Sequence, residues 1–218
     1  SLIKNKANQV NQNVKLEFNK TKIHLNPKEL NLVVKLQNPK ILIKSNEINL
    51  SKIDLFLALK SFITSDFLLQ RAEIAFFKND IKDLTKITNI FIPRIINKQI
   101  KKIFAKGKIE GEFVIPFNLD GTIAKNYKIN AKVLDADINI NNDLKIKNLS
   151  ADIKYIFVSN RHKKINFLIN QGKILNLDLQ KSSIDINLKD DNKIIKSIIK
   201  TNGELKYPAI RIISSLLR

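Results

Sequence analysis

Three of the five glycines in this 218-residue chain fall between residues 106 and 121, in the stretch KGKIEGEFVIPFNLDG. Glycine loops that bind phosphate need G-x-x-x-x-G-K-[ST] or G-x-G-x-x-G between a strand and a helix. Gly107, Gly111 and Gly121 match neither spacing, and here the helical pattern comes first. The spacing excludes a nucleotide loop and predicts a helix stop at Gly107 and a hairpin turn at Asp120-Gly121. Gly111 lies on the apolar phase of the strand between them, where glycine permits a bend or a close approach.

Other residues capable of catalysis or metal binding do not form a recognisable site. The chain has no Cys, which excludes a disulfide and a thiolate zinc site. His24 and His162 lie far apart beside lysines and are interpreted as surface residues. Carboxylates two residues apart share one strand face, and they form two pairs, Glu110 with Glu112 and Asp135 with Asp137. We interpret both pairs as solvated, and the sequence predicts a protein that is not an enzyme and has no catalytic residue, metal or cofactor.

The chain is strongly basic, with 39 Lys and Arg against 20 Asp and Glu and a net charge of +19. Such a charge favours nucleic acid or an anionic membrane surface as a partner. Proteins that bind single strands interleave basic residues with exposed aromatic ones. Here aromatic content is only 7%, Trp is absent, and the lysines are spread along the whole chain. We therefore expect no specific nucleic acid partner, and a basic nucleic-acid-binding domain is the lesser alternative.

Alternation of apolar and polar residues with period two dominates the chain and is typical of half-buried strands. It recurs over residues 14–18, 30–36, 41–50, 72–76, 127–133, 151–157, 165–169, 175–179 and 184–188. The fold class predicted is mainly β, with a long antiparallel, curved sheet and a helical insert. One face of the sheet is apolar, and the other carries lysine and asparagine.

Three segments depart from this period. Residues 55–66 are too densely apolar for a strand and predict a short helix or turn. Apolar residues at helical spacing predict an amphipathic helix around 80–105, capped by Asp80 or Asp83 and kinked or broken at Pro93. Residues 193–200, KIIKSIIK, predict a third short helix. The insert at about 80–105 would separate strand blocks 10–77 and 106–190 within a single β-rich unit, 1–218.

An apolar sheet face must be covered by something. A closed sandwich and an open, curved groove both satisfy this requirement. The alternation alone favours the sandwich.

The order of elements in residues 36–77, LQNPKILIKSNEINLSKIDLFLALKSFITSDFLLQRAEIAFF, resembles that of the AsmA-like proteins of the Gram-negative envelope, and among them the YhdP type. In this group an "ID-apolar-x-apolar" strand leads to an "L-x-S-apolar" turn and a new strand, as do Ile53-Asp54-Leu55, Leu59–Ile63 and Leu68–Phe77. KGKIEGEFVIPFNLDG is similar to the glycine-containing strand opening of the group. The resemblance covers roughly residues 30–160 and is one of pattern. The chain departs from the group in its richness in Lys and Asn and in lacking an N-terminal membrane anchor.

The resemblance implies an internal segment of a longer periplasmic protein, tethered to the inner membrane through a region outside this chain. It implies a β-groove that carries phospholipid acyl chains between inner and outer membranes, and it favours the open groove over the sandwich. Phospholipid acyl chains and a membrane are thus the expected partners, and protein partners are unknown. A structural β-sandwich or assembly module of the envelope is the alternative. The candidate groove-lining residues are Leu32, Val34, Leu36, Ile74, Phe76, Ile109, Gly111, Phe113, Ile115, Ile129, Val133, Ile153, Tyr155, Phe157, Ile165, Phe167 and Ile169.

Overall fold

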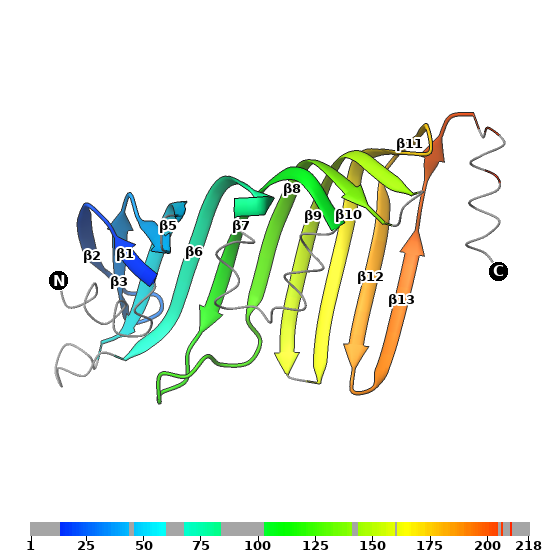
Figure 1. The fold of residues 1–218 in the computed structure, drawn as a ribbon. Coiled ribbons are helices and arrows are strands. Elements are labelled where there is room, and N and C mark those ends of the chain that lie inside the picture. The colour runs from blue at the N-terminus through cyan, green and yellow to red at the C-terminus, as the bar shows by residue number, and fades with distance from the viewer. Residues whose placement is uncertain are drawn as a thin grey trace.

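The computed structural model of this chain describes residues 14–43, 46–59, 68–83, 103–140, 144–159, 161–204, 206 and 210. These residues form one large, curved, antiparallel sheet that does not close on itself (Figure 1). The prediction of a mainly β fold with a long curved sheet is confirmed. The closed sandwich favoured by the alternation alone is wrong, since these residues form one open sheet rather than two packed ones.

The sheet contains fourteen strands. They are β1 Val14–Glu17, β2 Lys20–Asn26, β3 Asn31–Gln37, β4 Lys40–Ile43, β5 Asn46–Ala58, β6 Leu69–Asp80, β7 Phe104–Pro116, β8 Lys128–Asn139, β9 Lys145–Ser159, β10 His162–Ile174, β11 Leu177–Leu179, β12 Ser182–Lys189, β13 Asn192–Ile198 and β14 Thr201–Asn202. β13 and β14 extend the second strand block beyond the predicted limit at residue 190.

The long strand β5 pairs with different neighbours at its two ends. Its first residues pair with β4, which in turn pairs with β1, and its last residues pair with β3, whose other neighbour is β2. From β5 the sheet continues as a meander through β6, β7, β8, β9 and β10 to β12 and β13 (Figure 1). Among the described strands, β1, β2, β13 and β14 each have one neighbour and are edge strands, and β13 ends the meander.

Two clusters of buried apolar side chains lie along the sheet. The first is built on β3, β5 and β6, and Leu16, Phe18, Ile41 and Ile48 from the β1–β4 side pack against it; its buried members are Val34, Leu36, Leu50, Ile53, Leu57 and Phe76. The second is built mainly on β8, β9 and β10, and its buried members are Ile81, Val133, Ala136, Leu149, Ala151, Ile169 and Leu179. The core is therefore a layer against one sheet face.

The two ends of the predicted helix around 80–105 have different outcomes. At its start, residues 81–83 are helical, and the Lys82 N–H donates to Oδ1 of Asp80 at 2.7 Å, so Asp80 is the cap. Residues 84–102, with Pro93, lie outside the described residues. At its end Ile103 is helical and β7 begins at Phe104, close to the predicted boundary at about 105. The helix stop predicted at Gly107 is wrong, because Gly107 is a strand residue. Gly107 has a φ of 142°, and a Cβ there would lie 2.7 Å from that of Ala136, so a bulge and a close approach explain this glycine.

The other two predicted helices are also corrected. β5 continues to Ala58, so the start of segment 55–66 is strand, while residues 60–67 lie outside the described residues. Segment 193–200 forms β13 over most of its length, pairing with β12 so that Ile195 faces Ile186. Its helical spacing is overridden by this pairing and by the strand preference of β-branched isoleucine. The Asp120-Gly121 turn is confirmed, with φ 80° at Gly121 and a 2.9 Å hydrogen bond from Gly121 N–H to the Asn118 carbonyl.

Candidate functional site

The register of the strands aligns apolar residues into rows that run across the sheet. The longest row crosses nine strands, from β3 to β13, with each residue directly opposite the next. Its members are Leu36, Ile53, Ile74, Phe113, Ile129, Tyr155, Ile165, Ile186 and Ile195. We call this row the long row, and the side of the sheet that carries it the apolar face.

A parallel row on the same face contains the glycine singled out in the sequence. Its members from β5 to β12 are Leu50, Phe76, Gly111, Ala131, Ile153, Phe167 and Ile184. A Cβ on Gly111 would lie 2.7 Å from the Asn130 carbonyl oxygen and 3.1 Å from the Phe76 ring. Gly111 therefore permits a close approach of β8 and of an aromatic ring.

All seventeen candidate groove-lining residues lie on the apolar face. Ile109, Val133 and Ile169 belong to a third row, and the others follow from the alternation along β3, β7 and β9. The register thus brings together positions that are far apart in sequence. Their role in lining a lipid groove stays a prediction.

Exposure changes along the apolar face. Val133, Ala151 and Ile169 are buried in the second cluster, at one end of β8, β9 and β10. Towards the other end, Ile129 and Tyr155 are half-buried. That end carries the β7–β8 connection and the tight turns between β9 and β10 and between β12 and β13, at the lower edge of Figure 1. Along β8, β9 and β10 the apolar face is therefore more accessible towards these three connections.

A cavity of about 640 Å³ lies at this accessible end. It is lined by Ile123, Ala124, Lys125, Tyr127, Phe157, Ser159, Arg161 and Asp190, and we call it the aromatic pocket. The ring of Tyr127 stacks on Phe157, and its centroid lies 6.1 Å from that of Tyr155, a member of the long row. The pocket thus adjoins the apolar face. Burial, the neighbouring charge of Tyr127 and a hydrogen bond with it raise the pKa of Tyr155 to about 12.

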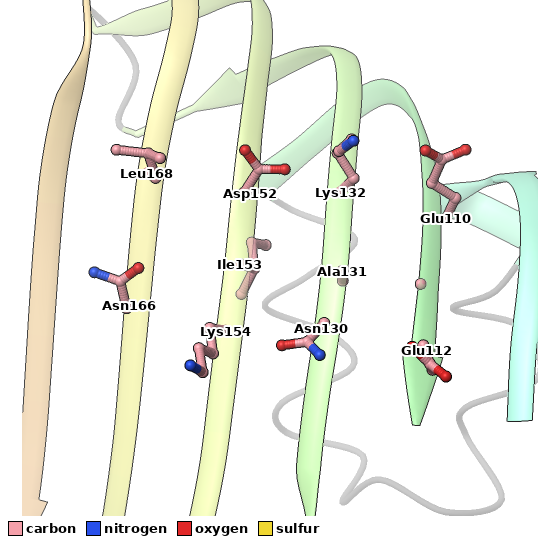
Figure 2. A pocket seen from close by; sticks show the side chains of 11 residues that line it. Glu110, Glu112, Asn130, Ala131, Lys132, Asp152, Ile153, Lys154, Asn166 and Leu168 are labelled. Atoms are coloured by element: carbon pink, nitrogen blue, oxygen red, sulfur yellow. The ribbon is translucent and has the colours of Figure 1, made fainter. Parts of the chain in front are cut away.

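The opposite face, which we call the polar face, carries charged and amide side chains. Figure 2 shows a depression of about 420 Å³ there, with Glu110, Lys132 and Asp152 along one side and Glu112, Asn130 and Lys154 along the other. Its remaining lining residues are Gly111, Ala131, Ile153, Asn166 and Leu168. Charges of both signs alternate across this depression, as expected of a solvated face.

The other residues considered for chemistry do not gather. Asp135 is exposed at a bulge with φ 49°, whereas Asp137 accepts the Asn148 N–H at 3.0 Å and pairs with Lys106 at 3.3 Å. His24 and His162 lie on β2 and β10, which are not neighbours. Among the described residues, no three His, Asp or Glu side chains are placed to hold a metal ion. In the same part of the chain, no helix has the length and apolar character needed to cross a membrane.

A group of ion pairs on the polar face joins β3, β5 and β6. Lys52 Nζ lies 2.7 Å from Glu73 Oε2 and 3.5 Å from Oδ2 of Asp54, whose side chain is 8% exposed. Burial lowers the pKa of Lys52, but the hydrogen bond and charge of Glu73, helped by the charge of Asp54, raise it on balance. Arg71 pairs with Glu73 at 3.1 Å. These contacts hold neighbouring strands together.

The aromatic pocket was missed by the sequence analysis. Tyr127, Arg161 and Asp190 come from three separate connections and Phe157 from β9, and only the register brings them together. The available signal was that Tyr127 begins one predicted strand, 127–133, and Phe157 ends the next, 151–157, which puts both on the same side of an antiparallel meander.

Comparison with known proteins finds no match to this chain among protein-family models, curated proteins or solved structures. Function is therefore proposed from the sheet and from the pattern of the sequence.

Proposed function

We propose that this chain is a segment of a bridge-like lipid-transfer protein of the cell envelope. Its apolar face carries phospholipid acyl chains between the inner and outer membranes, and it acts without catalysis. The observation that supports this most directly is the long row, which crosses nine strands without one charged or amide side chain. The resemblance to AsmA-like proteins supports the class of lipid and the place of action.

The physical basis is the transfer of hydrocarbon out of water. Each methylene group sheltered from water contributes about 0.8 kcal/mol. This attraction has no preferred direction, so an acyl chain can move from one row to the next without breaking a specific bond. The half-buried side chains of Phe113, Ile129 and Phe167 offer apolar contact without being fully enclosed. The polar face keeps the other side of the sheet in water.

The test is whether phospholipid co-purifies with the protein and depends on the apolar face. Native mass spectrometry and lipid extraction are applied to wild type, Ile129→Glu and Asn130→Glu. Residues 129 and 130 are neighbours on β8 and face opposite sides of the sheet. The two variants therefore add the same charge, but only Ile129→Glu places it on the apolar face. A second pair, Phe167→Glu and Asn166→Glu, repeats the comparison on β10. Circular dichroism checks that each variant folds.

We expect phospholipid on wild type and on Asn130→Glu and its loss from Ile129→Glu. A wild type free of phospholipid, or folded variants of both faces that retain it equally, would contradict the proposal. If Ile129→Glu and Phe167→Glu both unfold and wild type carries no lipid, a purely structural envelope module is supported instead. Tight, steeply salt-dependent binding to single-stranded DNA or RNA would favour the nucleic-acid alternative.

A further inference from the structure

We infer that the aromatic pocket binds the phosphate group of a phospholipid whose acyl chains lie on the apolar face. This inference rests on the proposed function and assigns a headgroup site to it. It concerns the pocket walls formed by Tyr127 and Phe157 and the cations Lys125 and Arg161.

The position of the pocket fits an amphiphile. One wall, formed by Ile123, Tyr127 and Phe157, is apolar and adjoins Tyr155 of the long row. The pocket is lined by residues of the three connections at the ends of the strands, and its Lys125, Arg161 and Asp190 are exposed, so that side faces water. An acyl chain on the long row would therefore place its headgroup in the pocket.

The charge around the pocket fits an anion. Lys125 and Arg161 line it, and Lys163 lies directly opposite Phe157 on the apolar face. In the part of the chain that the structure describes, none of these three cations takes part in an ion pair. Arginine and lysine that lack an ion pair, beside aromatic walls, favour a phosphate oxygen as partner.

One lining residue opposes this preference. Asp190 supplies the single carboxylate among the lining residues, and its backbone N–H donates to the Arg161 carbonyl at 2.7 Å. That bond ties the β12–β13 turn to the β9–β10 turn. With two cations and one carboxylate, the pocket wall is net positive. The depression on the polar face differs, since its charges of both signs alternate.

A phospholipid fits better than a soluble phosphate compound. A nucleotide or sugar phosphate would make no use of the apolar face beside the pocket. The stacking of Tyr127 on Phe157, with ring centroids 4.6 Å apart, also occupies one face of each ring. The inference therefore commits to a lipid phosphate, and soluble phosphates serve as a separate arm of the test.

The experiment measures which lipid the folded chain selects. The protein is incubated with mixed micelles containing equal amounts of dioleoylphosphatidylglycerol and dioleoylglycerol, which share acyl chains but differ in the phosphate. Bound lipids are then counted by native mass spectrometry. Wild type is expected to prefer the phosphate-bearing lipid about tenfold, since a hydrogen bond to a charged group is worth roughly that much. Lys125→Gln/Arg161→Gln should bring the ratio close to one while total bound lipid is retained.

Two control variants sharpen the result. Asp190→Asn removes the opposing carboxylate and should raise the preference for dioleoylphosphatidylglycerol. Lys164→Gln removes a cation next to Lys163 but on the polar face and should leave the ratio unchanged.

The failures of the two proposals are distinguishable. If no variant binds any lipid, both the groove and the headgroup site are wrong. If wild type binds lipid with a ratio near one, or the double variant keeps the wild-type ratio, the headgroup site is wrong and the groove stands. If millimolar inorganic phosphate or glycerol phosphate displaces the phospholipid, the pocket is a site for soluble phosphate and the inference is overturned.

Discussion

The ring of Tyr127 stacks on the ring of Phe157, with centroids 4.6 Å apart and an interplanar angle of 11°. Tyr127 ends the β7–β8 connection and Phe157 lies near the end of β9, so the pair fixes the connection against the sheet. The Phe157 N–H also donates to the Tyr127 carbonyl at 3.0 Å. Side chain and backbone together hold this wall of the aromatic pocket in place.

Replacing Tyr127 tests this role. Tyr127→Ala removes the stack and should lower the free energy of unfolding by about 2 kcal/mol, less than for a fully buried aromatic residue. Tyr127→Phe keeps the stack and should cost less than about 1 kcal/mol. Urea unfolding followed by circular dichroism measures both. Equal losses in the two variants would show that the hydroxyl group, and not the ring, carries the contribution.

Tyr155 gives a prediction for alkaline pH. Its pKa is raised to about 12 because burial, and next the charge and hydrogen bond of Tyr127, favour the neutral phenol. The pKa of Tyr155 in the folded protein lies above its ordinary value of about 10, so the unfolded chain loses this proton first as the pH rises. The contribution of Tyr155 to the free energy of unfolding is therefore fully present below pH 10 and is lost as the pH rises towards 12. Absorbance at 295 nm should show one of the three tyrosines titrating late.

Two variants assign that late transition. In Tyr155→Phe it should be absent, and stability should fall less between pH 10 and 12 than in wild type. In Tyr127→Phe the transition should move to lower pH, because the charge and hydrogen bond of Tyr127 are gone. A late transition that persists in Tyr155→Phe would contradict the assignment.

Gly111 is predicted to be required for packing. Gly111→Ala would place a Cβ 2.7 Å from the Asn130 carbonyl oxygen, a backbone atom that cannot move alone. We expect a loss of about 1–3 kcal/mol in the free energy of unfolding. Gly121→Asn is the matched control, because position 121 has φ 80° and open space, and asparagine tolerates that conformation. Thermal unfolding measures the stability of both variants. A Gly111→Ala variant as stable as wild type would mean that β8 approaches β7 less closely at this position.

The pairing of Lys52 with Glu73 is predicted to stabilise the β5–β6 contact. Lys52→Met leaves the buried carboxylate of Asp54 with Lys35 at 3.9 Å, and we expect a loss of about 1 kcal/mol, since partial exposure screens the pair. Lys40→Met breaks the exposed pair with Glu47, also at 2.7 Å, and should have little effect. Chemical denaturation measures both. A similar loss in the two variants would show that burial does not set the strength of these pairs.

The period of the sequence was sufficient to predict most of the strands and the apolar face of the sheet, although β2 was not predicted and β13 was predicted as a helix. Ile129 and Phe167 were assigned to one face from alternation alone, and the register agrees. The helix predicted at 193–200 failed because KIIKSIIK fits both periods, and its pairing with β12 decides between them. The aromatic pocket as a whole was not predictable, because the β9–β10 and β12–β13 turns that bring Arg161 and Asp190 to the Tyr127–Phe157 pair are set by the register across several strands.

The edge strand β13 gives a prediction for self-association. Ile194, Ile195 and Ile198 are 54%, 52% and 61% exposed, on a strand whose other side has no partner among the described strands. Exposed apolar edge strands pair readily with other chains, and a charged side chain blocks this. Ile195→Lys and Ile198→Lys should therefore reduce concentration-dependent association, measured by sedimentation velocity. Ser197→Lys adds the same charge without removing an isoleucine. If Ser197→Lys suppresses association as strongly as the two isoleucine variants, the association depends on backbone pairing at the edge, which the charge blocks. Apolar contact through the isoleucines then does not drive it.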